Sequence, residues 1–118
     1  MSADTLIALS GNFSVDIINI CSKIGDYKRG NVLASQLLRC GTSIGANIYE
    51  GNYAQSRADF ISKFHIALKE CYETEYWICV FYRTNIISRE DYEKLYFQCS
   101  KIRKKLTASI NTAKANSK

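Results

Sequence analysis

The sequence predicts an all-α fold, an antiparallel up-down-up-down bundle of four helices that occupies residues 1–118 as one domain. The chain contains no proline, the residue that most strongly interrupts helices. Apolar residues recur at intervals of three and four over four long segments. The segments are separated by short polar stretches, and short connections between long helices favour antiparallel neighbours.

The first two helices are expected at residues 5–24 and 31–54. Gly25 begins the polar stretch that ends the first of them. In the second, Gly41 and Gly45 lie four residues apart on one edge, where a missing side chain lets a neighbouring backbone approach. The two apolar stripes are Phe13, Ile17, Ile18, Ile20, Cys21 and Ile24, and Leu33, Leu37, Cys40, Ile44 and Ile48.

The third and fourth helices are expected at residues 57–84 and 89–112, with a turn at residues 85–87. Ser56 and Ser88 precede them as N-caps, each followed three residues later by an aspartate. The two apolar stripes are Phe60, Phe64, Ala67, Leu68, Cys71, Ile78, Phe81 and Tyr82, and Tyr92, Leu95, Cys99, Ile102, Leu106 and Ile110.

The third helix has a second set of apolar residues, which point away from the stripe that begins at Phe60. A helix that is apolar on two sides is normally buried on both. We therefore expect a contact with another subunit, since Trp and Tyr are enriched at such contacts. The alternative is a wide core contact with an exposed Trp77. The predicted oligomer interface comprises Ile66, Tyr76, Trp77 and Val80.

Polar side chains flank the apolar stripes of the second and third helices. Buried polar groups need hydrogen-bond partners, so we expect a buried polar seam between these two helices that fixes their register. A ligand pocket is the alternative. The predicted seam comprises Gln36, Ser43, Asn47, Glu50, Thr74 and Glu75.

The sequence predicts no enzyme, no catalytic or metal-binding residues and no cofactor. Its five cysteines contain no Cys-x-x-Cys pair and are expected to be reduced and largely buried. His65 is the single histidine, too few for the Glu-x-x-His pairs of di-metal bundles. Residues 41–47 lack the Gly-Lys-Ser/Thr ending of a phosphate loop.

Positive charge is concentrated near the end of the chain, whose net charge is +5. Lys94 and the residues after it include seven basic side chains and no acidic one. Lys94, Lys101 and Lys105 are predicted to form a line on the outer face of the fourth helix, with Lys104 beside it. These lysines are the candidate nucleic-acid contacts, and a merely solvated surface is the alternative. The chain shows no signal peptide and no apolar run long enough to span a membrane, so we expect a cytoplasmic protein.

Two motifs resemble those of one bacterial family, the four-helix-bundle proteins encoded in 23S ribosomal RNA intervening sequences. They are Ser-Ile-x-x-Asn-Ile-x-Glu at residues 43–50 and Lys-Glu-x-x-Glu-Thr-x-x-Trp at residues 69–77. The accessory variability determinant of diversity-generating retroelements is related to this family. The resemblance implies a ring-like homopentamer without catalytic activity. For the retroelement relative it also implies binding to a reverse transcriptase and, through a basic surface, to nucleic acid.

Two functions are compatible with these features. The first is a non-enzymatic, oligomeric scaffold associated with RNA or DNA, with a reverse transcriptase as its candidate partner. The second is a protein–protein interaction module, encoded in a ribosomal RNA intervening sequence, that binds no nucleic acid. Lysine-rich surfaces serve both, so the sequence leaves the choice open.

Overall fold

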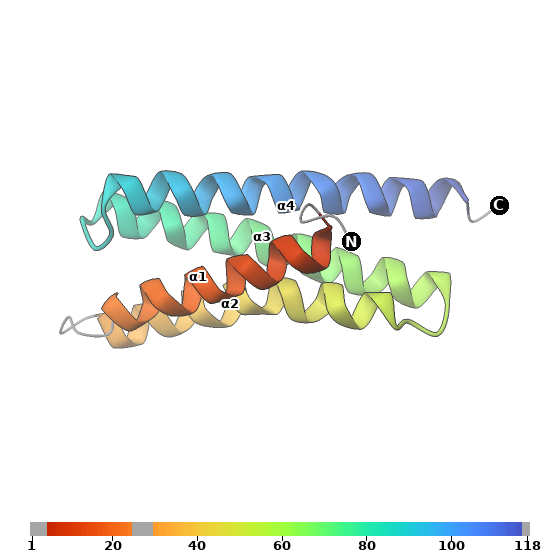
Figure 1. The fold of residues 1–118 in the computed structure, drawn as a ribbon, viewed down its shortest axis with the longest axis horizontal. Helices are drawn as coiled ribbons and strands as arrows, with labels where there is room; N and C mark the ends of the chain where they lie inside the picture. The colour runs from red at the N-terminus through yellow and green to blue at the C-terminus, as the bar shows by residue number, and fades with distance from the viewer. Residues whose placement is uncertain (1–4, 25–29, 117–118) are drawn as a thin grey trace.

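The computed structural model describes residues 5–24 and 30–116, in which all regular structure is helical. The side chains of residues 30 and 31 are outside this description. The elements are α1 (Leu6–Ile24), α2 (Gly30–Asn52), α3 (Arg57–Arg83) and α4 (Arg89–Ala115) (Figure 1). The predicted fold class and all four predicted helices are confirmed.

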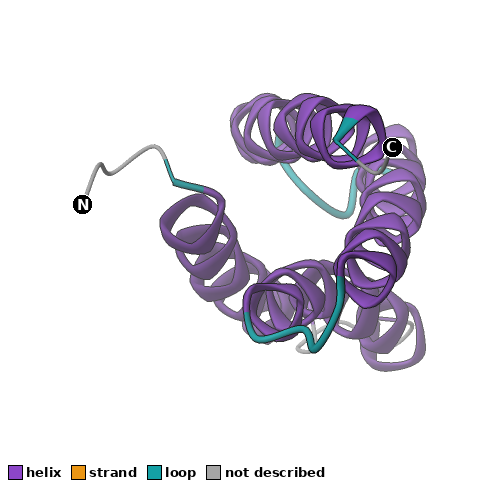
Figure 2. Ribbon diagram, turned by 90° about the vertical axis from the view of Figure 1, so that its right-hand side faces the viewer, coloured by secondary structure: helices purple, strands orange, loops and turns teal. Residues whose placement is uncertain are grey.

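The helices lie side by side along a molecule that measures 52 × 24 × 22 Å. Viewed near the bundle axis, they surround a common centre (Figure 2). Each packs on its neighbours in the order α1, α2, α3, α4, and α4 closes the arrangement against α1. Because α1 has 19 residues and α4 has 27, the last turns of α4 extend beyond the beginning of α1 (Figure 1).

Local signals place the beginnings of α3 and α4 where the sequence predicted them. The Ser56 hydroxyl accepts a hydrogen bond from the Asp59 backbone N–H at 3.1 Å, and Ser88 does the same for Asp91 at 3.0 Å. Each cap satisfies a backbone donor that the first helical turn leaves free. Asn85 reverses the chain between the helices with a φ of 63°, a left-handed conformation that asparagine adopts more readily than most residues.

Two predicted boundaries differ from the structure by more than one residue. Helix α2 ends at Asn52 rather than at residue 54, and α4 continues to Ala115 rather than ending at residue 112. The extra turn of α4 includes Ala113 and Lys114, which favour helix intrinsically, so its polar composition does not end it.

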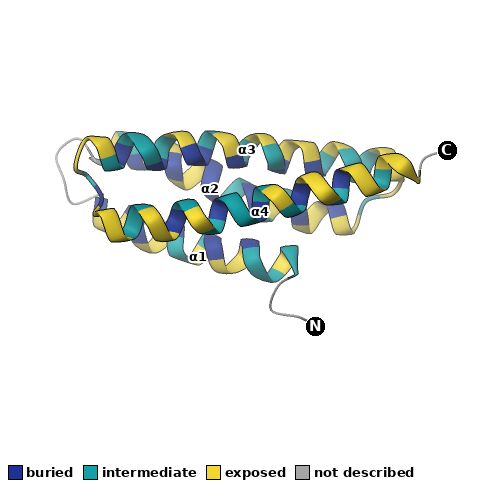
Figure 3. Cartoon of the chain, turned by 90° about the horizontal axis from the view of Figure 1, so that it is seen from above, coloured by how far each residue is buried: buried dark blue, intermediate teal, exposed yellow. Residues whose placement is uncertain are grey.

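The buried side chains form one core, and buried positions recur along the inner side of every helix (Figure 3). Ile18 is an error in the predicted stripes, because it is 48% exposed. It follows the fully buried Ile17 and is rotated by about 100° from it around the helix, which takes it outside the arc that faces the core. Leu33, Phe60, Leu68, Tyr82 and Tyr92 are half-buried and pack on the edge of this core.

Glycines allow α1 and α3 to pack closely on α2. A Cβ atom added at Gly41 would lie 2.9 Å from Cγ2 of Ile17, and one at Gly45 would lie 3.3 Å from the Ser10 carbonyl oxygen. At Gly51 the Cε1 atom of Phe64 would be 2.7 Å away. The predicted packing role of Gly41 and Gly45 is therefore confirmed.

The five cysteines differ in burial, and burial determines how reactive each thiol is. Cys79 is half-buried, whereas Cys21, Cys40, Cys71 and Cys99 are buried. Burial raises the pKa of both Cys21 and Cys40 to about 11, so their reactive thiolate forms are scarce at neutral pH.

A thiol-reactive dye should therefore label the native protein at Cys79 first and reach the other four cysteines only on unfolding. Peptide mass spectrometry after brief labelling would identify the modified site. A Cys79→Ser variant serves as the control and should show almost no rapid labelling. Fast labelling of Cys40 in the native protein would contradict the packing described above.

Candidate functional site

The outer surface between α2 and α3 carries a network of charges. Arg39 of α2 lies between two carboxylates of α3, 3.1 Å from Glu70 and in contact with Glu73. The indole N–H of Trp77 donates to the same Glu73 carboxylate at 3.3 Å. Because the Arg39 side chain is half exposed, the network contributes little to stability and mainly fixes how the two helices align. Glu70, Glu73 and Trp77 belong to the second family motif, but their contacts with Arg39 and with one another were not predicted from the sequence.

Four residues of the predicted buried seam do not form it. Gln36 and Glu50 are exposed in this structure, and Glu50 pairs with Lys63 at 3.1 Å. Ser43 and Asn47 are half-buried, and each donates to a carbonyl one turn back on α2 itself. The prediction is wrong for these residues because a carbonyl of the same helix, or solvent, satisfies them without a partner on α3.

Thr74 and Glu75 are buried as predicted, but Glu75 meets α4 rather than α2. Its carboxylate accepts a hydrogen bond of 2.7 Å from the Arg103 guanidinium. That hydrogen bond is the main reason that the pKa of Arg103 is raised, and the Glu75 charge raises the pKa of Tyr96. Arg103 also lies over the Tyr72 ring, 5.3 Å from its centroid. The Glu75–Arg103 pair at the edge of the core therefore joins α3 to α4 rather than α3 to α2.

The four lysines predicted to contact nucleic acid do not form one outward line. Lys94 is exposed, but its ammonium lies 3.7 Å from Asp16 of α1. Lys101 and Lys105 are half-buried, and Lys104 is exposed. The spacing of the stripe is helical as predicted, but the stripe lies on the flank of α4 that is turned toward α1, where packing covers part of it.

The predicted oligomer interface divides into two parts. Ile66 and Tyr76 are exposed on the outer ridge of α3. Trp77 and Val80 instead pack against the core, and the Trp77 ring lies 6.0 Å from that of Phe81. The prediction that all four point away from the core is wrong, because the large indole folds back over its own helix. Whether Ile66 and Tyr76 contact another subunit stays a prediction.

A different surface exposes more apolar side chains, and we call it the uncharged face. Gly45 of α2 faces Ser10 and Ser14 of α1. Residues one or two turns from these three positions lie on the outer surface shared by α1 and α2, and Val15 adjoins this surface one turn before Ile18. Val15 is 56%, Ile18 48% and Tyr49 56% exposed. The uncharged face comprises Ile7, Val15, Ile18, Leu38 and Tyr49.

The charges of α1 and α2 all turn away from this face. Within the described parts of the two helices these are Asp16 and Lys23, then Arg39 and Glu50. The first two line a cleft shared with α4, and the last two pair with α3. An exposed apolar surface without charge is typical of a protein contact.

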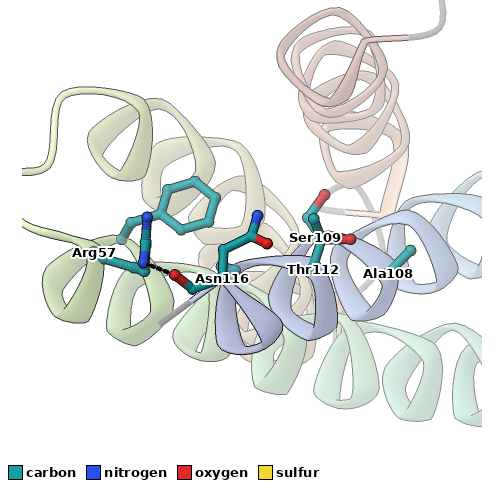
Figure 4. Close-up of a pocket in the computed structure, with 7 residues that line it drawn as sticks. Arg57, Ala108, Ser109, Thr112 and Asn116 are labelled. Carbon is teal, nitrogen blue, oxygen red and sulfur yellow. Dashed lines mark hydrogen bonds between the residues drawn. The ribbon is translucent and has the colours of Figure 1, made fainter. Parts of the chain in front are cut away.

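A cleft of about 550 Å³ lies where α4 extends past α1 (Figure 4). Its one charged residue is Arg57, and the guanidinium of this residue donates to the Asn116 carbonyl (Figure 4). The cleft thus has no pair of titratable groups for acid–base chemistry. In residues 5–24 and 30–116, no three His, Cys, Asp or Glu side chains are grouped to hold a metal ion. None of the described helices is long and apolar enough to cross a membrane.

Comparison with known proteins places this bundle in a family. The family model for 23S rRNA-intervening sequence proteins matches residues 6–108. The chain belongs to this family. A crystal structure of a protein of unknown function from the S23 ribosomal protein family of Bacteroides thetaiotaomicron is similar, with 45% sequence identity and a TM-score of 0.87. The match covers 90% of this chain and 98% of that one, and no curated protein matches.

Proposed function

We propose that this member of the 23S rRNA-intervening sequence family is a non-enzymatic scaffold that assembles from several copies of itself. The uncharged face is the observation that supports the proposal best. It exposes large apolar side chains from two adjacent helices, while the charges of those helices are directed toward α3 and α4. Leaving such a surface in water costs free energy that a second copy recovers by covering it. We expect five copies, the number that the family resemblance implies.

Sedimentation of matched variants tests which face assembles. Val15→Lys together with Ile18→Lys places two charges on the uncharged face at exposed positions, so the bundle itself should tolerate them. We expect this variant to sediment as a 13.4 kDa monomer at concentrations where the parent is larger. The control is Ile66→Lys with Tyr76→Lys, on the ridge that the sequence favoured.

The control variant should keep the parent mass if assembly uses the uncharged face. If instead the double variant of α3 dissociates and the double variant of α1 does not, the protein still assembles, but through the outer ridge of α3 and not through the uncharged face. Circular dichroism of both variants confirms that helicity is retained.

A second function, contact with nucleic acid, is favoured by the charge of α4. From Lys94 to Asn116 the helix and its cap carry no acidic residue. Such a surface attracts phosphates with little sequence preference and with strong salt dependence. Replacement of Lys94, Lys101 and Lys105 by glutamine should flatten the dependence of affinity on salt without changing helicity or mass. A parent that binds neither RNA nor DNA at low salt would leave the protein–protein interaction module as the function.

A reverse transcriptase partner, the link to retroelements and a cytoplasmic location stay predictions.

A further inference from the structure

The outer surface shared by α3 and α4 carries exposed aromatic rings beside lysines. Phe97 is 69%, Tyr76 60% and Tyr72 56% exposed. Lys69 and Lys104 are also exposed on the same two helices. We call these five residues the aromatic–lysine patch. Aromatic rings that face water at neighbouring positions gain free energy when a flat apolar partner covers them.

The register of the two helices places the residues of the patch at matching heights along the bundle. Tyr82 stacks on Tyr92 with ring centroids 4.4 Å apart, and the thiol of Cys99 reaches the Cys71 carbonyl at 3.5 Å. In an antiparallel pair with these contacts, Tyr76 and Phe97 lie at nearly the same height along the bundle. By the same register, Lys69 and Lys104 also lie at nearly the same height as each other, about two helical turns from Tyr76 and Phe97 along the bundle.

Acidic residues of the same helices pair with cations outside the patch. The exposed Glu93, one turn before Phe97 on α4, pairs with Arg89 at 2.7 Å. Glu73 is paired with Arg39 on the opposite flank of α3, and Glu75 is held inside by Arg103. Within the described chain, Lys69 and Lys104 make no ion pair. The two lysines are therefore available to phosphates.

One ring of the patch is held in place. Arg103 is fixed by its ion pair with Glu75 and by a 3.2 Å hydrogen bond to the Ser100 hydroxyl. Its guanidinium in turn lies over the Tyr72 ring. Tyr76 follows Tyr72 by one turn, about 6 Å along the helix axis. A fixed ring loses less conformational entropy when a partner stacks on it.

We propose that the aromatic–lysine patch binds single-stranded nucleic acid, with bases stacked on Tyr72, Tyr76 and Phe97 and phosphates near Lys69 and Lys104. This inference rests on the nucleic-acid function proposed above and narrows its ligand. A duplex hides the faces of its bases, whereas a single strand can offer them to aromatic side chains. The patch lies on the side of the bundle opposite the uncharged face, so assembly through that face leaves it open.

Fluorescence anisotropy with labelled oligothymidylate, oligouridylate and a duplex of equal length tests the proposal. The full chain should bind both single strands more tightly than the duplex. Phe97→Ala and Tyr76→Ala remove exposed rings and leave good helix formers, so the fold is retained. Each should weaken single-strand binding by about tenfold, as loss of one stacked base does, and leave duplex binding unchanged.

Two controls separate stacking from other effects. Tyr53→Ala removes an equally exposed ring from the turn after α2 and should bind like the parent. Phe97→Tyr keeps a ring and should bind single strands as well as the parent does. Lys69→Gln with Lys104→Gln should weaken all three probes and reduce the salt dependence.

The outcomes also separate this inference from the function on which it rests. A parent that prefers the duplex, or alanine variants that bind single strands as the parent does, would overturn the single-strand site while nucleic-acid binding stands. A parent that binds no probe at low salt would overturn both and assign the patch to a protein partner.

Discussion

Replacing Arg103 with leucine should lower the free energy of unfolding by about 2–3 kcal/mol, the largest effect expected of a single polar residue in this bundle. The Glu75 carboxylate is only 10% exposed and receives its ion pair from Arg103. Without that partner, a largely buried charge is left uncompensated. Denaturant unfolding at a fixed protein concentration measures the loss, since assembly also contributes to apparent stability.

A double-mutant cycle shows whether the loss comes from the pair. Glu75→Leu combined with Arg103→Leu removes both charges and should be less destabilising than Arg103→Leu alone. As a control, Arg89→Leu breaks the exposed pair with Glu93 and should be hard to distinguish from the parent. If the effects of Glu75→Leu and Arg103→Leu on the free energy of unfolding were strictly additive, Glu75 and Arg103 would not act together.

Gly41→Leu should destabilise the bundle by about 2–3 kcal/mol, because its side chain has no room between α1 and α2. Even the first added carbon would lie 2.9 Å from Ile17, which is fully buried. The side chain of Ile17 cannot move aside without disturbing the core around it. Thermal or denaturant unfolding would measure the loss.

Alanine at two glycines gives the matched comparison. Nothing lies within 4 Å of a Cβ atom at Gly11, so Gly11→Ala should gain about 1 kcal/mol from helix propensity. Gly41→Ala has the same intrinsic gain but meets Ile17, and it should gain nothing or lose stability. An equal gain at both positions would mean that the close packing at Gly41 is incorrect.

The sequence was sufficient for the helices because their signals are local. Spacings of three and four define a stripe whatever the neighbours are, and Ser56 and Ser88 cap the backbone of their own turns. Gly41 and Gly45 were also readable, since two glycines four residues apart mark one edge of a helix.

The sequence was not sufficient to show which neighbour each helix edge meets. Glu75 lies at one edge of the core stripe of α3, and the opposite edge faces α2. Four antiparallel helices can be arranged around the core with left-handed or right-handed connections. Both arrangements bury the same apolar stripes, but they exchange the helices that lie beside the two edges of each stripe. For this reason Glu75 was assigned to α2, and the lysine stripe of α4 was predicted to face outward although Lys94 meets Asp16 of α1.

The uncharged face was missed for a related reason. Val15 and Ile18 follow the helical pattern closely enough to pass for core residues or for isolated surface residues. Only the close packing of α1 on α2 shows that they share one surface with Leu38 and Tyr49. The charges of both helices then prove to lie on the other flanks, a property of the pair that neither segment shows alone.

The mass of the parent protein in solution tests the scaffold account most directly. Light scattering at micromolar concentration should give a value several times the 13.4 kDa of one chain, and the value should persist at high salt because the assembling face carries no charge. A mass of 13.4 kDa across the same range would contradict the account, since the exposed apolar surface of α1 and α2 would then have no second copy to cover it.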